Sequence, residues 1–246
     1  YLYTDNRSRP AHPLHHRPDR PPVPVAPTTL PTSVWVSKRY REAYQAVVEL
    51  VGKAGVKLDD GASPAADSLI VVTPFGHDAT TAAVDEALDA SRVVAIDALF
   101  PLVGTQRRTL MTTPATTRAA RDAGHALFSA DGVPVTVIRD STGFVAQRVV
   151  ATIVNIGCDI AQKQIATPED IDLAVMLGLG YPRGPLALGD ALGAKTILTI
   201  LRNMFDVLGD PRYRPSPWLA RRAQLGMSLT QSDAADTQTE IPETQQ

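Results

Sequence analysis

Short apolar runs alternate with segments of helical composition between residues 34 and 140. A run of about 4–8 apolar residues between turn residues is typical of a strand that is buried on both faces. The predicted strands are Val34–Val36, Val56–Leu58, Ser68–Thr73, Arg92–Leu99, Arg108–Thr113 and Val135–Ile138. The predicted helices between them are Arg41–Ala54, Thr80–Ala90 and Pro114–Ala130. This alternation predicts an α/β domain with a mostly parallel sheet of the Rossmann type, covered on both faces.

The pattern changes from Gly143 onward, where long apolar helices follow one another without strands. The predicted helices are Phe144–Ile165, one that starts at Thr167–Asp170, Ala194–Leu208 and Pro217–Leu225. Thr167 is a typical cap residue, a proline follows it, and the next two acids suit the positive end of the helix dipole. The sequence therefore predicts a truncated Rossmann-type domain over residues 34–140 and an all-helical domain over 141–229.

Two polar tails flank these domains. Residues 1–33 hold eight of the 20 prolines, and such a segment buries too little apolar area to offset its ordering entropy. We expect 1–33 and 230–246 to be disordered. The spacing of His12, His15 and His16 would suit a metal, but a chance cluster in a tail is the favoured interpretation, so no metal site is expected. Because the chain starts with Tyr1, we expect an incomplete or processed N-terminus.

Composition and charge limit the classes of binding partner that the sequence indicates. The 246 residues are 44% hydrophobic and 20% charged, as in an ordinary globular protein. The net charge of −2 gives no indication of a nucleic-acid or anionic-membrane partner. No apolar run approaches the roughly 18 residues of a membrane span. The single cysteine, Cys158, fits a reducing compartment, so we expect a cytoplasmic protein.

Four motifs in the helical half resemble the 3-hydroxyacyl-CoA dehydrogenase family. They are Asp140–Arg148, with its Gly-Phe and Gln-Arg pairs; Ala166–Asp172; the Gly- and Pro-rich segment Gly178–Asp190, followed by Gly193; and Arg214–Trp218 with Gly226. Their order over about 90 residues makes the resemblance specific. Taken from the residues alone, the glycines and prolines permit tight turns, and Asp172 and Asp190 are more plausible as structural helix-cap or turn acids than as catalytic ones.

The resemblance implies an enzyme that oxidises the 3-hydroxyl group of an acyl-CoA with NAD in fatty-acid-type metabolism. It also implies that the helical domain mediates dimerisation and closes over the acyl-CoA. The residues agree in one respect, because a helix as apolar as Val149–Ile160 needs burial on most sides. A partner subunit, or a second copy of the fold within a longer chain, would supply part of that burial.

The segment between the first strand and helix departs from the family. A dinucleotide site needs a glycine-rich turn there, so that the backbone can approach the pyrophosphate. Residues 37–42 read Ser-Lys-Arg-Tyr-Arg-Glu and contain no glycine. Lys38, Arg39 and Arg41 could offer charge to a phosphate, although a solvated basic loop is favoured. The nucleotide domain is also shortened between Asp60 and Ser68.

Three residues remain as candidate cofactor contacts. Asp59 and Asp60 lie about 20 residues after the first helix begins, where the resemblance places the acid that binds the ribose. Thr73 opens the segment Thr73–Asp78 after the central strand, where open α/β sheets bind ligands. His77 in that segment could be a displaced acid/base group, but a surface-loop histidine is favoured, and His125 is expected to be structural.

The family's catalytic positions are also altered. The resemblance places the catalytic His at Asp97 and the substrate-binding Asn at Gln147, and it finds no acid in 110–113 for the family's partner Glu. Ser91 is a poor match for the substrate-contacting Ser. A carboxylate, with an ordinary pKa near 4, is a weaker base than His at neutral pH unless burial raises that pKa. Gln147 can still donate and accept hydrogen bonds to an acyl thioester.

Two functional hypotheses follow. The first is an NAD-dependent 3-hydroxyacyl-CoA dehydrogenase, or a piece of one. The second is a non-catalytic, degenerate module for dimerisation or acyl-CoA binding within a longer polypeptide or a complex, working as a homo-oligomer or paired with a second repeat. The altered turn and Asp97 favour the second hypothesis for this chain taken alone.

Overall fold

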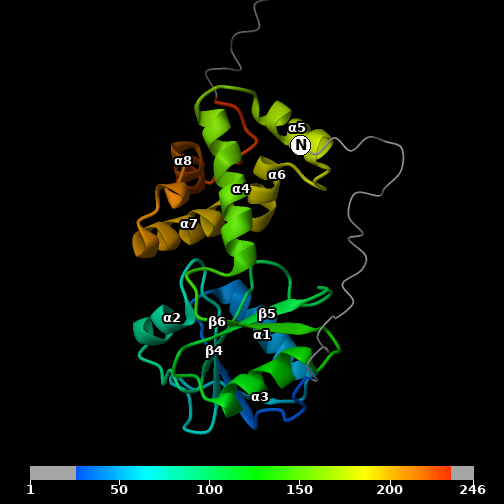
Figure 1. Cartoon of the computed structure of the whole chain (residues 1–246), viewed down its shortest axis with the longest axis vertical. Coiled ribbons are helices and arrows are strands. Elements are labelled where there is room, and N and C mark those ends of the chain that lie inside the picture. Colours follow the sequence, from blue (N-terminus) through cyan, green and yellow to red (C-terminus); the bar gives the residue numbers. More distant parts are fainter. Residues whose placement is uncertain (1–25, 234–246) are drawn as a thin grey trace, which may run out of the picture.

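The computed structural model describes residues 26–233 and shows a sheet domain joined to a helical domain by one long helix (Figure 1). That helix, α4 (Val145–Gln162), rises from the edge of the sheet domain and runs through the middle of the helical domain. The predicted change of architecture near Asp140 therefore coincides with the junction between the two parts. The predicted fold class, a Rossmann-type sheet followed by an all-helical domain, is confirmed.

The sheet has six strands in the order β2-β1-β3-β4-β5-β6. Their bounds are β1 (Ser33–Val36), β2 (Lys57–Asp59), β3 (Leu69–Val72), β4 (Val93–Ile96), β5 (Arg108–Thr112) and β6 (Val135–Arg139). All neighbours are parallel except β4 and β5, which are antiparallel. The link from β4 to β5 contains no helix, and a parallel crossover usually needs one.

Alternate residues of the strands serve two separate cores. On one face, α1 (Arg41–Lys53) and α3 (Arg118–Ser129) pack on a cluster that includes Val34, Val71 and Leu110. On the other face, α2 (Ala79–Asp85) packs with Trp35, Ile70 and Met111. The sheet is thus covered on both faces, as its continuous apolar strands predict.

The helix expected over Thr80–Ala90 is shorter than predicted. Asp78 caps it as expected, by accepting a hydrogen bond from the Thr81 N–H, but α2 ends at Asp85. Ala87 lies in the left-handed region at φ 52°, a conformation that a right-handed helix cannot continue through. This early end places Asp85 and Glu86 beside the turn that follows β1.

Five helices and a short 3₁₀ turn form the second domain. They are α4, α5 (Pro168–Leu179), α6 (Pro185–Leu192), α7 (Ala194–Leu208), the turn Pro211–Tyr213 and α8 (Pro217–Leu225). The sequence did not predict α6, because its glycines and neighbouring prolines read as turns. Asp172 accepts hydrogen bonds from the backbone N–H groups of Leu186 and Ala187, which caps this helix from a distance. The expectation that Asp172 is a capping acid is therefore correct.

Most of the two predicted tails lies outside residues 26–233, and so do His12, His15 and His16. Within the described part, Ser33 is buried and begins β1, one residue before the predicted domain start. In that same part, no group of three or more His, Cys, Asp or Glu side chains is arranged to hold a metal ion. Nor does any helix of residues 26–233 have the length and apolar character needed to cross a membrane.

Candidate functional site

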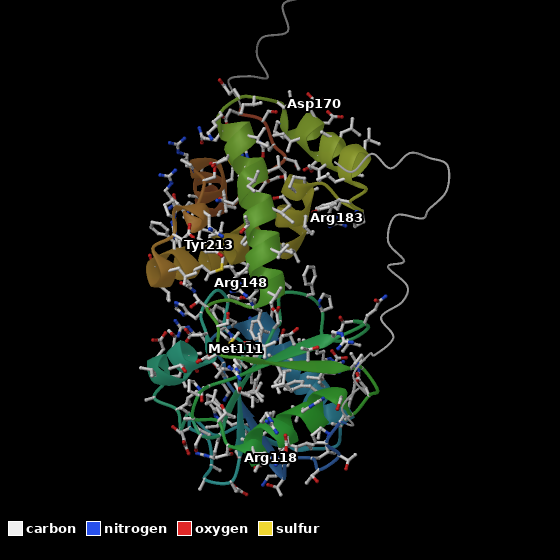
Figure 2. The ribbon with its side chains drawn as sticks, in the orientation of Figure 1. Met111, Arg118, Arg148, Asp170, Arg183 and Tyr213 are labelled. Carbon is white, nitrogen blue, oxygen red and sulfur yellow. The ribbon has the colours of Figure 1, made fainter. Side chains whose placement is uncertain are left out.

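The side chain of Gln147 lies fully buried where α4 meets the sheet domain. Its Oε1 accepts a hydrogen bond from the Gly76 N–H over 2.8 Å, and its Nε2 donates to the Pro74 carbonyl over 3.0 Å. Nε2 also donates to Asp97 Oδ1 over 2.9 Å. Arg148, the next residue, lies at the end of α4 nearest the sheet domain (Figure 2). The structure thus brings together the two residues expected at the family's base and amide positions.

Asp97 follows β4 and is held from two sides. Besides Gln147, the backbone N–H of Leu99 donates to Oδ1 over 3.1 Å. Burial raises the pKa of the Asp97 carboxyl above its ordinary value, and the hydrogen bonds from Gln147 and Leu99 oppose that rise. A raised pKa makes a carboxylate a better proton acceptor at neutral pH. The residue at the expected base position therefore lies in an environment that raises its pKa, which favours proton abstraction.

The side-chain amide of Gln147 forms its hydrogen bonds with partners inside the protein. Both N–H groups of its amide donate, and its oxygen already accepts one bond, so only one lone pair is uncommitted. As arranged, the side chain fixes two loops of the sheet domain to α4. Substrate contact by Gln147 stays a prediction, and it requires the exchange of an existing partner.

The segment Thr73–Asp78 after β3, which the sequence placed at a ligand crevice, forms the other half of this junction. Asn203 on α7 donates from Nδ2 to the Phe75 carbonyl over 2.7 Å. A Cβ added to Gly76, whose φ is +78°, would lie 2.8 Å from the Ile200 Cα of α7. The segment thus lies between α4 and α7, and its backbone forms hydrogen bonds with side chains of both helices.

The acids at the end of β2, Asp59 and Asp60, make hydrogen bonds within the protein, so ribose contact by either stays a prediction. The Asp59 carboxylate accepts hydrogen bonds from Gly61 N over 3.2 Å, Ala65 N over 2.8 Å and Ser68 Oγ over 2.7 Å. The bond from the Ala65 N–H is the main reason that the pKa of Asp59 is lowered. This carboxylate closes the short loop to β3. The backbone carbonyl of the exposed Asp60 accepts a hydrogen bond from Lys38 Nζ over 3.1 Å.

The turn after β1 is occupied by the protein itself. Ser37 Oγ lies 2.9 Å and 2.7 Å from the two carboxylate oxygens of Glu86. A cavity of about 10 Å³ remains here, lined in part by Thr73, His77 and Glu86. That volume holds about one water molecule. The residues present therefore do not fit the diphosphate of NAD at this turn, since a carboxylate and a serine side chain stand where a dinucleotide fold leaves space.

Thr73 and His77 border the small cavity. The buried Thr73 Oγ1 has no hydrogen-bond partner among the described residues. Burial lowers the pKa of the half-buried His77 imidazole, which favours its neutral form at pH 7. Glu86 was not predicted from the sequence. The helix expected over Thr80–Ala90 placed it inside a helix, and its partner Ser37 is 49 residues away, so no local signal marked it.

Comparison with known proteins identifies the helical half. The family described as 3-hydroxyacyl-CoA dehydrogenase, C-terminal domain, matches residues 143–234. A 3-hydroxyadipyl-CoA dehydrogenase of Escherichia coli K12 is 45% identical over 94 residues, which are 38% of this chain and 20% of that protein. A probable 3-hydroxybutyryl-CoA dehydrogenase of Deinococcus radiodurans is 39% identical over 88 residues, 36% of this chain and 32% of that protein. The chain thus covers no more than a third of the length of these two relatives.

Solved structures extend the similarity into the sheet domain. A 3-hydroxybutyryl-CoA dehydrogenase of E. coli K12 superposes with a TM-score of 0.57 and 34% identity over 63% of this chain and 31% of that chain. That enzyme is therefore about twice as long as this chain. An (S)-3-hydroxybutyryl-CoA dehydrogenase of Ralstonia eutropha shares the fold, with a TM-score of 0.61 and 23% identity over 79% of this chain and 66% of that one. Residues 143–234 of this chain are therefore similar to the C-terminal domain of the 3-hydroxyacyl-CoA dehydrogenase family.

Proposed function

We propose that this chain serves the NAD-dependent oxidation of the 3-hydroxyl group of an acyl-CoA, as the acyl-CoA-binding and assembly module of a 3-hydroxyacyl-CoA dehydrogenase. One observation carries the proposal: a helical domain of that family is joined to a sheet domain whose β1–α1 turn is closed by Glu86. In this proposal NAD is held by another copy of the fold, and the reaction takes place in the cytoplasm.

A second candidate is that this chain carries out the oxidation with its own NAD. The observation that favours it is the contact of 2.9 Å between Asp97 and Gln147, the residues expected at the family's base and amide positions. The raised pKa of Asp97 suits proton abstraction from a hydroxyl group. This candidate requires the turn at Ser37 to open before a diphosphate can enter.

Separate binding measurements distinguish the two candidates. Calorimetric titration of the full chain with acetoacetyl-CoA is expected to show binding, whereas titration with NADH is expected to show none. Oxidation of NADH in the presence of acetoacetyl-CoA, abolished by Asp97→Ala, would instead establish the second candidate. Absence of acetoacetyl-CoA binding would overturn the proposed acyl-CoA role.

The assembly part of the proposal rests on α5, a helix that is apolar but largely uncovered. Only Pro168 and Ile171 are buried in it. Leu173, Leu177 and Leu179 are 49%, 78% and 66% exposed. A helix that is apolar on several sides normally packs against protein on those sides.

We assign a second helical domain of this family as the partner of that surface. The E. coli relative of about twice this length leaves room for another copy of the fold, and a second copy of this chain is the matching partner in a homo-oligomer. Light scattering after size-exclusion chromatography should show a dimer for the wild type and a monomer for Leu177→Glu. Leu225→Glu on α8, at a site that is 72% exposed, is the matched control and should leave the dimer intact. A monomeric wild type would refute pairing between copies.

A further inference from the structure

The C-terminal end of α2 docks on the turn between β1 and α1 through two acidic side chains. Glu86 accepts the Ser37 hydroxyl over 2.9 Å and 2.7 Å. Beside it, Arg39 Nη1 lies 2.8 Å from Asp85 Oδ2. Ser37 Oγ also accepts the backbone N–H of Arg39 over 3.2 Å, so the same hydroxyl joins the carboxylate to the backbone of the turn.

The negative charges at this contact are unfavourable at the C-terminus of α2 but favourable at the N-terminus of α1. Carboxylates at a helix C-terminus face its negative end, whereas an anion before a helix N-terminus faces the positive end. The 13-residue helix α1 begins at Arg41, and its N-cap Tyr40 supplies no side-chain hydrogen bond. The Glu86 carboxylate therefore brings to this turn the negative charge that the N-terminus of α1 favours.

The place of this contact in the fold is specific. In an open parallel sheet, a dinucleotide sets its diphosphate at the first strand–helix turn, against the helix N-terminus. β1 is the first strand, and it is paired with β2 on one side and β3 on the other. The turn at Ser37 is thus the phosphate position of this fold. Resting on the proposed function, we propose that Glu86 is a built-in anion that replaces the nucleotide phosphate, so that the sheet domain is closed without a dinucleotide.

The surroundings of Glu86 retain features of an anion site. Thr73 lines the same cavity and is 3% exposed, and its Oγ1 has no hydrogen-bond partner within residues 26–233. A hydroxyl with an unused donor is suited to a phosphate oxygen. With Glu86 in place, the cavity of about 10 Å³ admits no phosphate.

A ligand has a route to this position. A groove of about 360 Å³ lies beside the turn and is bordered by Lys38, Arg39 and Glu86. Trp35 and residues 62–64 and 87–88 complete its walls. Glu86 borders both this groove and the cavity at Ser37 and Thr73, so removal of its carboxylate would open one toward the other. It would also leave Lys38 and Arg39, the latter still paired with Asp85, beside the N-terminus of α1.

The test is titration of the full chain with ADP, used as a diphosphate probe. Glu86→Ala is expected to bind ADP at least tenfold more tightly than the wild type, with Glu86→Gln intermediate. Glu86→Gln retains an acceptor for Ser37, so it keeps the folded state accessible if Glu86→Ala unfolds. Glu49→Ala removes one exposed carboxylate from α1 and should leave ADP affinity at the wild-type value.

Two results would overturn the proposal. One is a wild type that binds ADP as tightly as the Glu86 variants. The other is a folded Glu86→Gln, judged by its circular dichroism, whose affinity equals that of the wild type. Neither result depends on acetoacetyl-CoA binding or on dimer formation, which test the proposed function separately.

Discussion

The amide of Gln147 joins the Asp97 carboxylate to the backbone of the loop after β3, with a distance of 2.9 Å between Nε2 and Oδ1. One fully buried side chain of α4 therefore holds two loops of the sheet domain. The junction between the domains depends on this polar network because Gln147, Pro74 and Gly76 are all buried.

Replacement of Gln147 by Ala should destabilise the protein. The change leaves the Gly76 N–H and the Pro74 carbonyl without their hydrogen-bond partner, and each buried unsatisfied group costs about 1–3 kcal/mol. We expect the free energy of unfolding, measured with urea, to fall by about 2–4 kcal/mol. Gln45→Ala, at an exposed position of α1, should change it by less than about 0.5 kcal/mol. Equal effects of the two substitutions would contradict the role of Gln147 in the junction.

Asp97 should make the stability depend on pH. Burial raises its folded-state pKa above the unfolded value of about 3.9, so the folded state binds more protons between these two values. The free energy of unfolding then falls as pH rises through that interval, and the loss is complete above the raised pKa. Asp97→Asn removes this loss and keeps an oxygen acceptor for Gln147 and Leu99.

The measurement is urea denaturation at a series of pH values from about 4 upward. The stability of Asp97→Asn relative to the wild type should increase as pH rises and then level off. Asp67→Asn, at an exposed site, serves as the control. If the wild type and Asp97→Asn have parallel pH profiles, the Asp97 carboxyl is not destabilised by its burial.

Regular periodicity explains what the sequence predicted well. The apolar face of α1 and the ends of α7 and α8 follow from 3.6-residue spacing and glycine stops, which are local properties. Helix α6 escaped prediction because its cap, Asp172, lies 14 residues before Leu186, so the signal is not local. A distant cap of this kind can be recognised only once the chain is folded.

The candidate site also contains residues that the sequence predicted and one that it did not. Asp97 and Gln147 were named from the order of the family motifs, although 50 residues separate them, and the structure brings them into contact. Glu86 was not named, because its partner Ser37 is 49 residues away and no local pattern links them. Ribose contact by Asp59 stays a prediction, and its carboxylate already accepts hydrogen bonds from Ala65 and Ser68 that close the short loop to β3.

Gly76→Ala should disturb the docking of the two domains. The added methyl group would overlap the Ile200 carbonyl and lie 2.8 Å from its Cα, and the φ of +78° disfavours any L side chain. Gly104 has a similar φ of +75° but open space around its Cα, so Gly104→Ala isolates the backbone cost of about 1–2 kcal/mol. We expect Gly76→Ala to lower the free energy of unfolding by at least about 2 kcal/mol more than Gly104→Ala does. Similar losses in the two variants would mean that α7 yields to the added methyl group.

Asp131 should stabilise the sheet domain above pH 4 and lose that effect in acid. It pairs with the buried Arg108 guanidinium over 2.7 Å, and chiefly this hydrogen bond lowers the pKa of Asp131 to about 2. The folded-state pKa lies below the unfolded value of about 3.9, so the stabilisation is present above pH 4 and disappears as pH falls toward 2. Because the Asp131 side chain is 37% exposed, solvent screening limits the effect to about 1 kcal/mol. Urea denaturation of the wild type between these pH values should show this loss, and Asp131→Asn should lack it. Glu49→Gln, in an exposed pair with Lys53, should leave the loss of stability at low pH unchanged. If Asp131→Asn loses as much stability at low pH as the wild type does, that loss arises from another carboxylate.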